Sequence, residues 1–132
     1  MKLSHIKFET KVSNDLKALK GRTGITPNLL CRMSFCLSVE DVSPLDPDAF
    51  PGDSDRIIDR HVLLGGYDTL FVAMMKERMH QDGLDPHDGE LLGKHFRAHV
   101  HRGVHLLTKR TRSLADLARV IGKPQTTAAA SV

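Results

Sequence analysis

Two pairs of histidines and a set of basic residues have the types and spacing that could bind a metal ion or a phosphate group. His95 and His99 are four residues apart, as are His101 and His105, so a helix would place each pair on one face, where two imidazoles can bind a metal ion. The two pairs point in different directions, few acids lie nearby, and neither first histidine begins an HExxH motif. We therefore predict no metal site and no cofactor. The alternative is a partly exposed basic helix that gains charge as the pH falls and attracts phosphate together with Arg97, Arg102, Lys109, Arg110 and Arg112.

Basic residues nearer the amino-terminal end suit contacts with a phosphate backbone. Residues 16–37 (LKALKGRTGITPNLLCRMSFCL) indicate a basic helix, a tight turn and an apolar helix. Backbone N–H groups at the start of the second helix, at Thr26, are suited to binding a phosphate. For Arg22 and Thr26 an ordinary helix–helix corner is the alternative. The predicted DNA contacts are Lys7, Lys11, Lys17, Lys20, Arg22 and Thr26.

Catalytic patterns are otherwise absent from the sequence. It contains no Walker loop, and its glycines do not form a dinucleotide-binding motif. The segment with Asp46, Asp48, Asp53 and Asp55 lacks the spacing of an EF-hand loop and indicates a solvated loop. Cys31 lies among apolar residues of a predicted helix, which favours a buried structural thiol over a nucleophile. We expect no catalytic residue and no enzymatic activity.

The charge of the chain is segregated along its length. Residues 1–32 carry a net charge of +5, residues 40–59 carry −6 and residues 94–123 carry +7, within a total of +3. Two basic ends around an acidic middle favour a polyanion-binding surface beside an acidic loop. With no Trp and one Tyr, the chain lacks the aromatic faces on which single-stranded bases stack. The two cysteines predict free thiols, and no signal segment or membrane-length apolar run is present, so we expect a cytoplasmic protein without membrane contact.

The elements that position these residues are mainly helical. Alternation over residues 6–11 predicts a short strand, and because no second strand is convincing, we expect its partner to come from another subunit. Ser13 is the predicted cap of a first helix that stops at Gly24. Thr26 and Pro27 then begin a second helix that ends near residue 39, with Leu29 and Cys36 widening its core stripe.

The second half of the chain predicts three more helices. Residues 40–60 form an acidic loop, residues 68–81 a third helix and residues 89–109 a fourth helix, capped by Asp85 and Pro86. Gly93 and Gly103 mark close helix contacts, and Ser113 caps a fifth helix that ends at Ile121. The predicted fold is thus a single, mainly α domain over residues 1–122, with about five helices and a short amino-terminal strand. The strand and the first two helices resemble the start of ribbon–helix–helix proteins. Residues 123–132 read as a disordered tail.

Three ordered blocks of this sequence resemble the DndE family of DNA sulfur-modification proteins. They are residues 19–37 (LKGRTGITPNLLCRMSFCL), 63–73 (LLGGYDTLFVA) and 96–107 (FRAHVHRGVHLL). The resemblance implies a small helical homotetramer that binds double-stranded DNA, with a preference for nicked DNA. It also implies partner proteins that carry out the exchange of a phosphate oxygen for sulfur, so no catalytic residue is carried over. The residues that resemble the family's basic helix and turn are Lys17, Lys20 and Arg22.

The leading hypothesis is therefore a DNA-binding accessory protein of phosphorothioation that grips phosphates and reads few bases. One alternative is a sequence-specific repressor of the ribbon–helix–helix type, with paired strands in the major groove. Another is a metal-dependent DNA nickase that uses the histidine-rich helix.

Overall fold

The computed structural model describes residues 3–50 and 56–122, without the side chains of residues 121 and 122. The described part has five helices of nine or more residues and one short helix, which confirms the predicted mainly α fold. The α-helices are α1 (Thr10–Thr23), α2 (Pro27–Glu40), α3 (Arg60–Leu64), α4 (Asp68–Gln81), α5 (Gly89–Arg110) and α6 (Leu114–Gly122). The remaining elements are the strands β1 (His5–Lys7) and β2 (Ile57–Asp59) and the 3₁₀ turns η1 (Pro47–Ala49) and η2 (Gly65–Tyr67).

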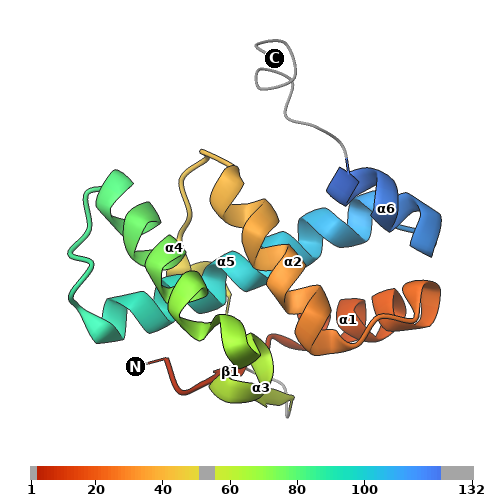
Figure 1. Ribbon diagram of the computed structural model, residues 1–132, viewed down its shortest axis with the longest axis horizontal. Helices are drawn as coiled ribbons and strands as arrows, with labels where there is room; N and C mark the ends of the chain where they lie inside the picture. The colour runs from red at the N-terminus through yellow and green to blue at the C-terminus, as the bar shows by residue number, and fades with distance from the viewer. Residues whose placement is uncertain (1–2, 51–55, 123–132) are drawn as a thin grey trace.

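Helix α5 is the central element of the fold. It runs across the molecule behind α2, with α4 at one end and α1 and α6 at the other (Figure 1). Its buried residues recur at helical spacing and include Phe96, Val100, Val104 and Leu107. Phe35 of α2 stacks on Phe96 with ring centroids 4.4 Å apart, and Phe71 of α4 lies 5.6 Å from Phe35. In the absence of Trp, phenylalanines thus join α2, α4 and α5.

Helix α1 begins earlier than the sequence suggests. The prediction of Ser13 as its cap is wrong, because the helix starts at Thr10 and Glu9 is the capping position. Ser13 is buried instead, and its hydroxyl accepts a hydrogen bond from Nε of Arg56 at 3.1 Å. The predicted stop is confirmed: Gly24 adopts the left-handed conformation with a φ of 73°, which favours glycine.

The predicted strand has its partner in the same chain. β1 pairs antiparallel with β2, and Ile6 lies opposite Ile58. Phe8 N–H and Arg60 N–H donate to the carbonyls of Arg56 and Ser4 at 3.1 and 2.9 Å, which extends the ladder at both ends. The expectation that a second subunit supplies the strand that pairs with β1 is therefore wrong. The pairing within one chain also removes the main argument for a ribbon shared between subunits.

Helix α2 confirms its predicted start and contradicts part of its predicted core stripe. Thr26 is the capping residue and Pro27 the first helical residue. The buried positions of this helix are Leu30, Cys31, Ser34, Phe35 and Ser38. Cys36 is exposed and Leu29 is 40% exposed, so neither widens the core as expected.

The described part of the acidic loop is held against the helices by two arginines. Arg78 of α4 donates to the carbonyls of Val39 and Asp41 at 2.9 and 2.7 Å. Arg102 of α5 donates to the carbonyls of Ser38 and Ser43 at 2.7 and 2.8 Å. The segment after α2 is therefore anchored, and it is not the freely solvated loop that its composition suggested.

The later helices follow the sequence prediction closely. α4 covers 68–81 as predicted, and α5 extends one residue beyond the predicted range. The predicted cap at Asp85 and Pro86 is wrong, because Asp88 is the capping residue and its carboxylate accepts the N–H of Leu91 at 3.2 Å. Ser113 caps α6 as predicted, since its hydroxyl accepts the N–H of Asp116. Residues 51–55 of the acidic loop and the predicted tail 123–132 lie outside the described residues.

Within residues 3–50 and 56–122, no helix is both long enough and apolar enough to cross a bilayer.

Candidate nucleic-acid interface

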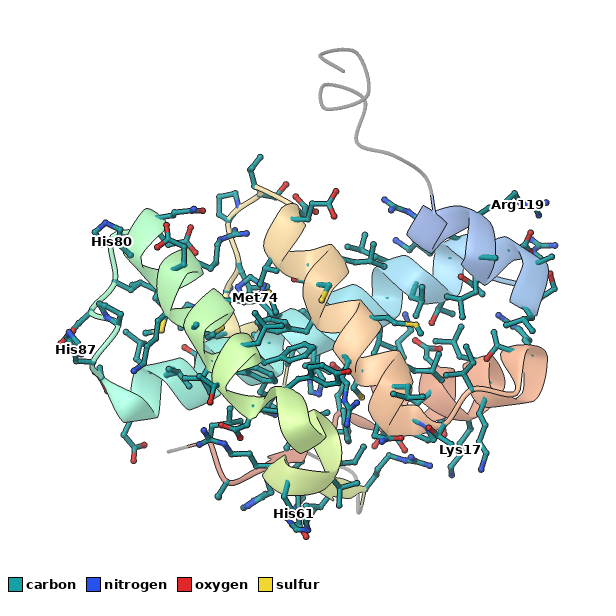
Figure 2. All side chains as sticks on the ribbon, in the orientation of Figure 1. Lys17, His61, Met74, His80, His87 and Arg119 are labelled. Atoms are coloured by element: carbon teal, nitrogen blue, oxygen red, sulfur yellow. The ribbon has the colours of Figure 1, made fainter. Side chains whose placement is uncertain are left out.

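The outer face of α1 carries two of the predicted contacts. Val12, Leu16 and Leu19 are completely buried and fix which side of this helix faces the core. Lys17 and Lys20 are exposed. Three residues apart on a helix corresponds to about 60° around its axis, so the two ammonium groups project from one side. In Figure 2, Lys17 lies on the flank of the molecule away from α4.

A second side of α1 borders α5. Lys11 and Arg22 are eleven residues apart, which places them within about 20° of each other around the helix and about 16 Å apart along it. Arg22 is exposed, and its Nη1 donates to the carbonyl of Thr111, just after α5, at 3.4 Å. Between them Asp15 lies 3.7 Å from Nδ1 of His105. This side of α1 is thus a seam of mixed charge along α5.

The remaining two predicted contacts lie at opposite ends of α1. Lys7 is exposed on β1, before the helix begins, and its carbonyl accepts Nε of Arg97 at 2.8 Å. Thr26 is exposed after the helix ends, and its hydroxyl donates to Oδ1 of Asn28 at 2.6 Å. The six predicted residues therefore do not converge on one point. They are distributed along the whole of α1 and its two ends.

The histidine-rich helix is not a phosphate-binding surface over most of its length. His99 and His101 are completely buried and His95 is 7% exposed. Burial lowers the pKa of His99 and of His101 to about 3, so both are neutral at physiological pH. His105 is partly buried, and burial lowers its pKa as well, with the nearby Lys11 adding to the effect. The interpretation of these histidines as added positive charge is therefore wrong for His99 and His101.

The buried histidines have structural contacts. Nδ1 of His99 lies 2.7 Å from the hydroxyl of Ser38. The ring of His101 packs between Phe8 and Phe50, with centroid separations of 5.4 and 5.5 Å. Over residues 3–50 and 56–122, no three His, Cys, Asp or Glu side chains are grouped so as to hold a metal ion.

Two of the arginines considered for phosphate attraction have structural roles. Arg102 donates to the hydroxyl of Ser38 as well as to the carbonyls after α2. Arg97 donates to the carbonyl of Lys7. Sequence reasoning could not separate these residues from solvent-facing ones, because their partners are more than fifty residues away along the chain. Exposed cations of the same stretch are Lys109, Arg110 and Arg112.

The cysteines do not form a reactive site. Both are free, as predicted. Burial raises the pKa of the Cys31 thiol to about 12. Cys36 is exposed at the surface, but partial desolvation of its thiol by neighbouring groups also raises its pKa, with the carboxylate of Glu40 contributing. Because the thiolate is the nucleophilic form, neither residue is activated at neutral pH.

Comparison with known proteins agrees with the fold and with the sequence blocks. The family model described as DNA sulphur modification protein DndE matches residues 5–115. The crystal structure of DndE from Escherichia coli B7A, involved in DNA phosphorothioation modification, is 30% identical with a TM-score of 0.65, and the match covers 81% of this chain and 98% of that one.

A second crystal structure, of a DndE mutant with two glycine-to-lysine changes that is involved in DNA phosphorothioation, is 26% identical with a TM-score of 0.64. That match covers 81% of this chain and 99% of the other. No curated protein sequence matches the chain. The family match spans most of the sequence, and the chain therefore belongs to the DndE family of DNA sulphur modification proteins.

Proposed function

We propose that this protein is a non-catalytic accessory of DNA phosphorothioation that binds duplex DNA, and nicked duplex by preference, through phosphate contacts. Its family membership supports the pathway. The observation that carries the DNA-binding part is the exposed pair Lys17 and Lys20 on the outer face of α1. Among the described residues, neither ammonium group is paired with a carboxylate.

The length of α1 suits a duplex backbone. Its 14 residues span about 21 Å, a distance over which one DNA strand presents about six phosphates. Lys17 and Lys20 lie on the outer side of α1 along this length, and Lys11 and Arg22 lie on the side that borders α5. Contacts of this kind release counterions and carry no sequence information, so affinity falls steeply with salt while different sequences bind alike. A nicked duplex bends at a lower energetic cost than an intact one, which is the physical basis for the preference.

The proposed assembly is a homotetramer that works with other sulfur-modification proteins. Its support is a set of exposed apolar side chains around the start of α2 and the α3–α4 region. Leu29, Val62, Tyr67 and Leu70 are 40–58% exposed. Asn28 donates to the carbonyl of Val62 at 3.4 Å, and Arg32 lies over the ring of Tyr67, so these elements adjoin one another. Exposed apolar groups that adjoin are typical of a protein contact surface.

The test is a salt titration of binding to one duplex sequence, either intact or nicked. The Lys17→Ala, Lys20→Ala double variant removes two charges from α1. Lys76→Glu changes the net charge equally at an exposed position of α4, on the other side of the molecule. We expect the double variant alone to lower the slope of log affinity against log salt by about two, since each phosphate contact contributes about 0.9.

Three outcomes would contradict the proposal. A wild-type protein that does not bind duplex DNA at low salt would overturn the function, and an equal loss in both variants would reject α1 as the contact surface. Nicking of supercoiled plasmid by the purified protein with Mg²⁺, Mn²⁺ or Zn²⁺ would show that it is an enzyme. Oligomer mass measured on the same samples tests the tetramer.

A further inference from the structure

We propose that Arg110 and Arg112, at the junction of α5 and α6, form a second set of duplex-phosphate contacts continuous with α1. This inference rests on the proposed function and adds a binding element from the opposite end of the sequence. It assigns the α5–α6 junction a role in gripping the nucleic-acid backbone. Arg102 and Arg78, by contrast, use their guanidinium groups to hold the protein's own carbonyls.

The first observation is the conformation of the junction. Thr111 separates the two arginines, is completely buried and has an extended backbone with φ −126° and ψ 113°. Successive side chains of an extended segment alternate in direction. The buried side chain of Thr111 therefore directs both neighbours to the outside, and Arg110 and Arg112 are both exposed.

The second observation is the link to α1. The carbonyl of Thr111 accepts Nη1 of Arg22, one of the predicted DNA contacts. This hydrogen bond brings the side of α1 that carries Arg22 next to the junction. In Figure 2, Lys17 on α1 and Arg119 on α6 lie on the same flank of the molecule, opposite His80 and His87. Arg22 of α1 and the two arginines of the junction, from distant parts of the sequence, are thus neighbours.

The third observation concerns Asp116, the acidic residue of α6 nearest the junction. Asp116 accepts the backbone N–H of Arg112 at 3.1 Å and pairs with the side chain of Arg119. These hydrogen bonds lower the pKa of Asp116, with the Arg112 N–H as the main cause. The carboxylate therefore fixes the backbone of the junction without engaging the guanidinium of Arg110 or Arg112. Within residues 3–50 and 56–122 those two guanidiniums make no ion pair, and they are available to an external anion.

Arginine is suited to this role because its planar fork matches two phosphate oxygens at once. Arg110 lies in the last turn of α5, where the helix macrodipole is negative, so its charge is also favourable to the folded helix. The ligand expected from this chemistry is the backbone of double-stranded DNA.

The experiment compares binding of the full chain to one blunt DNA duplex at several salt concentrations. For the Arg110→Ala, Arg112→Ala double variant we expect a slope lowered by about two and an affinity reduced about tenfold to hundredfold at 0.1 M salt. The charge-matched variant Lys76→Glu should keep the wild-type slope. The Arg110→Lys, Arg112→Lys variant should recover most of the slope, because it restores both charges. Circular dichroism and thermal unfolding of each variant show that the fold is intact.

Several results would overturn the inference. An unchanged slope in the arginine double variant, while Lys17→Ala with Lys20→Ala lowers it, would reject the junction and leave the proposed function standing. An equal loss in Lys76→Glu would attribute the effect to total charge. If the wild-type protein binds no duplex at all, the proposed function itself fails.

Discussion

Gly103 of α5 lies directly against the backbone of Ser34 of α2. A Cβ atom at Gly103 would stand 1.8 Å from the Ser34 carbonyl oxygen, a distance that no real contact allows. We predict that Gly103→Ala lowers the free energy of unfolding by about 3 kcal/mol, the upper end of the usual cost of overpacking. The cost is high because the atoms that the added Cβ meets belong to the backbone of α2, which cannot move aside as a flexible side chain can.

Urea denaturation would measure this effect, and Gly21→Ala provides the control. Gly21 lies within α1, is exposed and has nothing within 4 Å of its added Cβ. Alanine there should stabilise the protein by about 0.5–1 kcal/mol through helix propensity. A harmless Gly103→Ala would show that α2 and α5 do not approach each other this closely.

As the pH is lowered, the protein should begin to lose stability at pH values above the range in which carboxylates titrate. The folded pKa of His101 is about 3, below the value of 6.5 expected in the unfolded chain, so the unfolded state binds the proton more readily. The stability that neutral His101 contributes is present above pH 6.5 and is lost as the pH falls toward 3. The expected slope for this group is up to about 1.4 kcal/mol per pH unit.

The measurement is the free energy of unfolding at several pH values between 7 and 4.5. His101→Leu should reduce the slope, because it removes a ring whose two buried nitrogens have no hydrogen-bond partner among the described residues. His61→Leu, at an exposed position of α3, should leave the slope unchanged. Identical slopes in all three proteins would mean that His101 is not buried as a neutral ring.

Arg78 should be among the most important polar residues for stability. Only 5% of it is exposed, and it donates to the carbonyls of Val39 and Asp41 and to the carboxylate of Asp82. Arg78→Met would leave these acceptors without their donor, at a cost of about 2–4 kcal/mol. Thermal unfolding of Arg78→Met and of Lys76→Met, an exposed change on the same helix, tests this prediction. A comparable effect of the two substitutions would argue against the arginine anchor.

The amino-terminal end of α5 should depend on Asp88. Asp88→Ala removes the acceptor for the N–H of Leu91 and should lower the free energy of unfolding by about 1 kcal/mol. Asp88→Asn keeps a side-chain acceptor and should cost much less. Chemical denaturation of the two variants distinguishes them, and the absence of a difference would place the cap elsewhere.

The helices could be predicted because they depend on local patterns. The apolar spacing from Leu70 to Met79 fixes α4, and glycine at Gly24 and serine at Ser113 end or begin a helix through contacts within a few residues. Gly93 and Gly103 were predicted as close helix contacts, and the proximity of Ser34 confirms this for Gly103. Periodicity and capping residues act over one or two turns, so the sequence alone displays them.

Features that depend on distant partners could not be predicted. β2 has only three residues and only one of them is partly buried, so it becomes a strand through its pairing with β1. Arg102 and Arg110 look alike in the sequence, but the first holds carbonyls of residues 38–44 and the second is exposed. Counting charge along the chain cannot tell which cations already have partners, and the candidate interface was only partly predictable for this reason.

The pairing of β1 with β2 has a consequence for how the protein is made. Residue 57 is synthesised fifty residues after residue 7, its partner in the ladder. At about 5–20 residues per second, roughly 3 to 10 s separate their appearance on the ribosome. During that interval Ile6 and Phe8, both completely buried in the finished protein, lack the strand that pairs with their backbone. A nascent chain of this protein therefore has a period in which its first strand is open to chaperones.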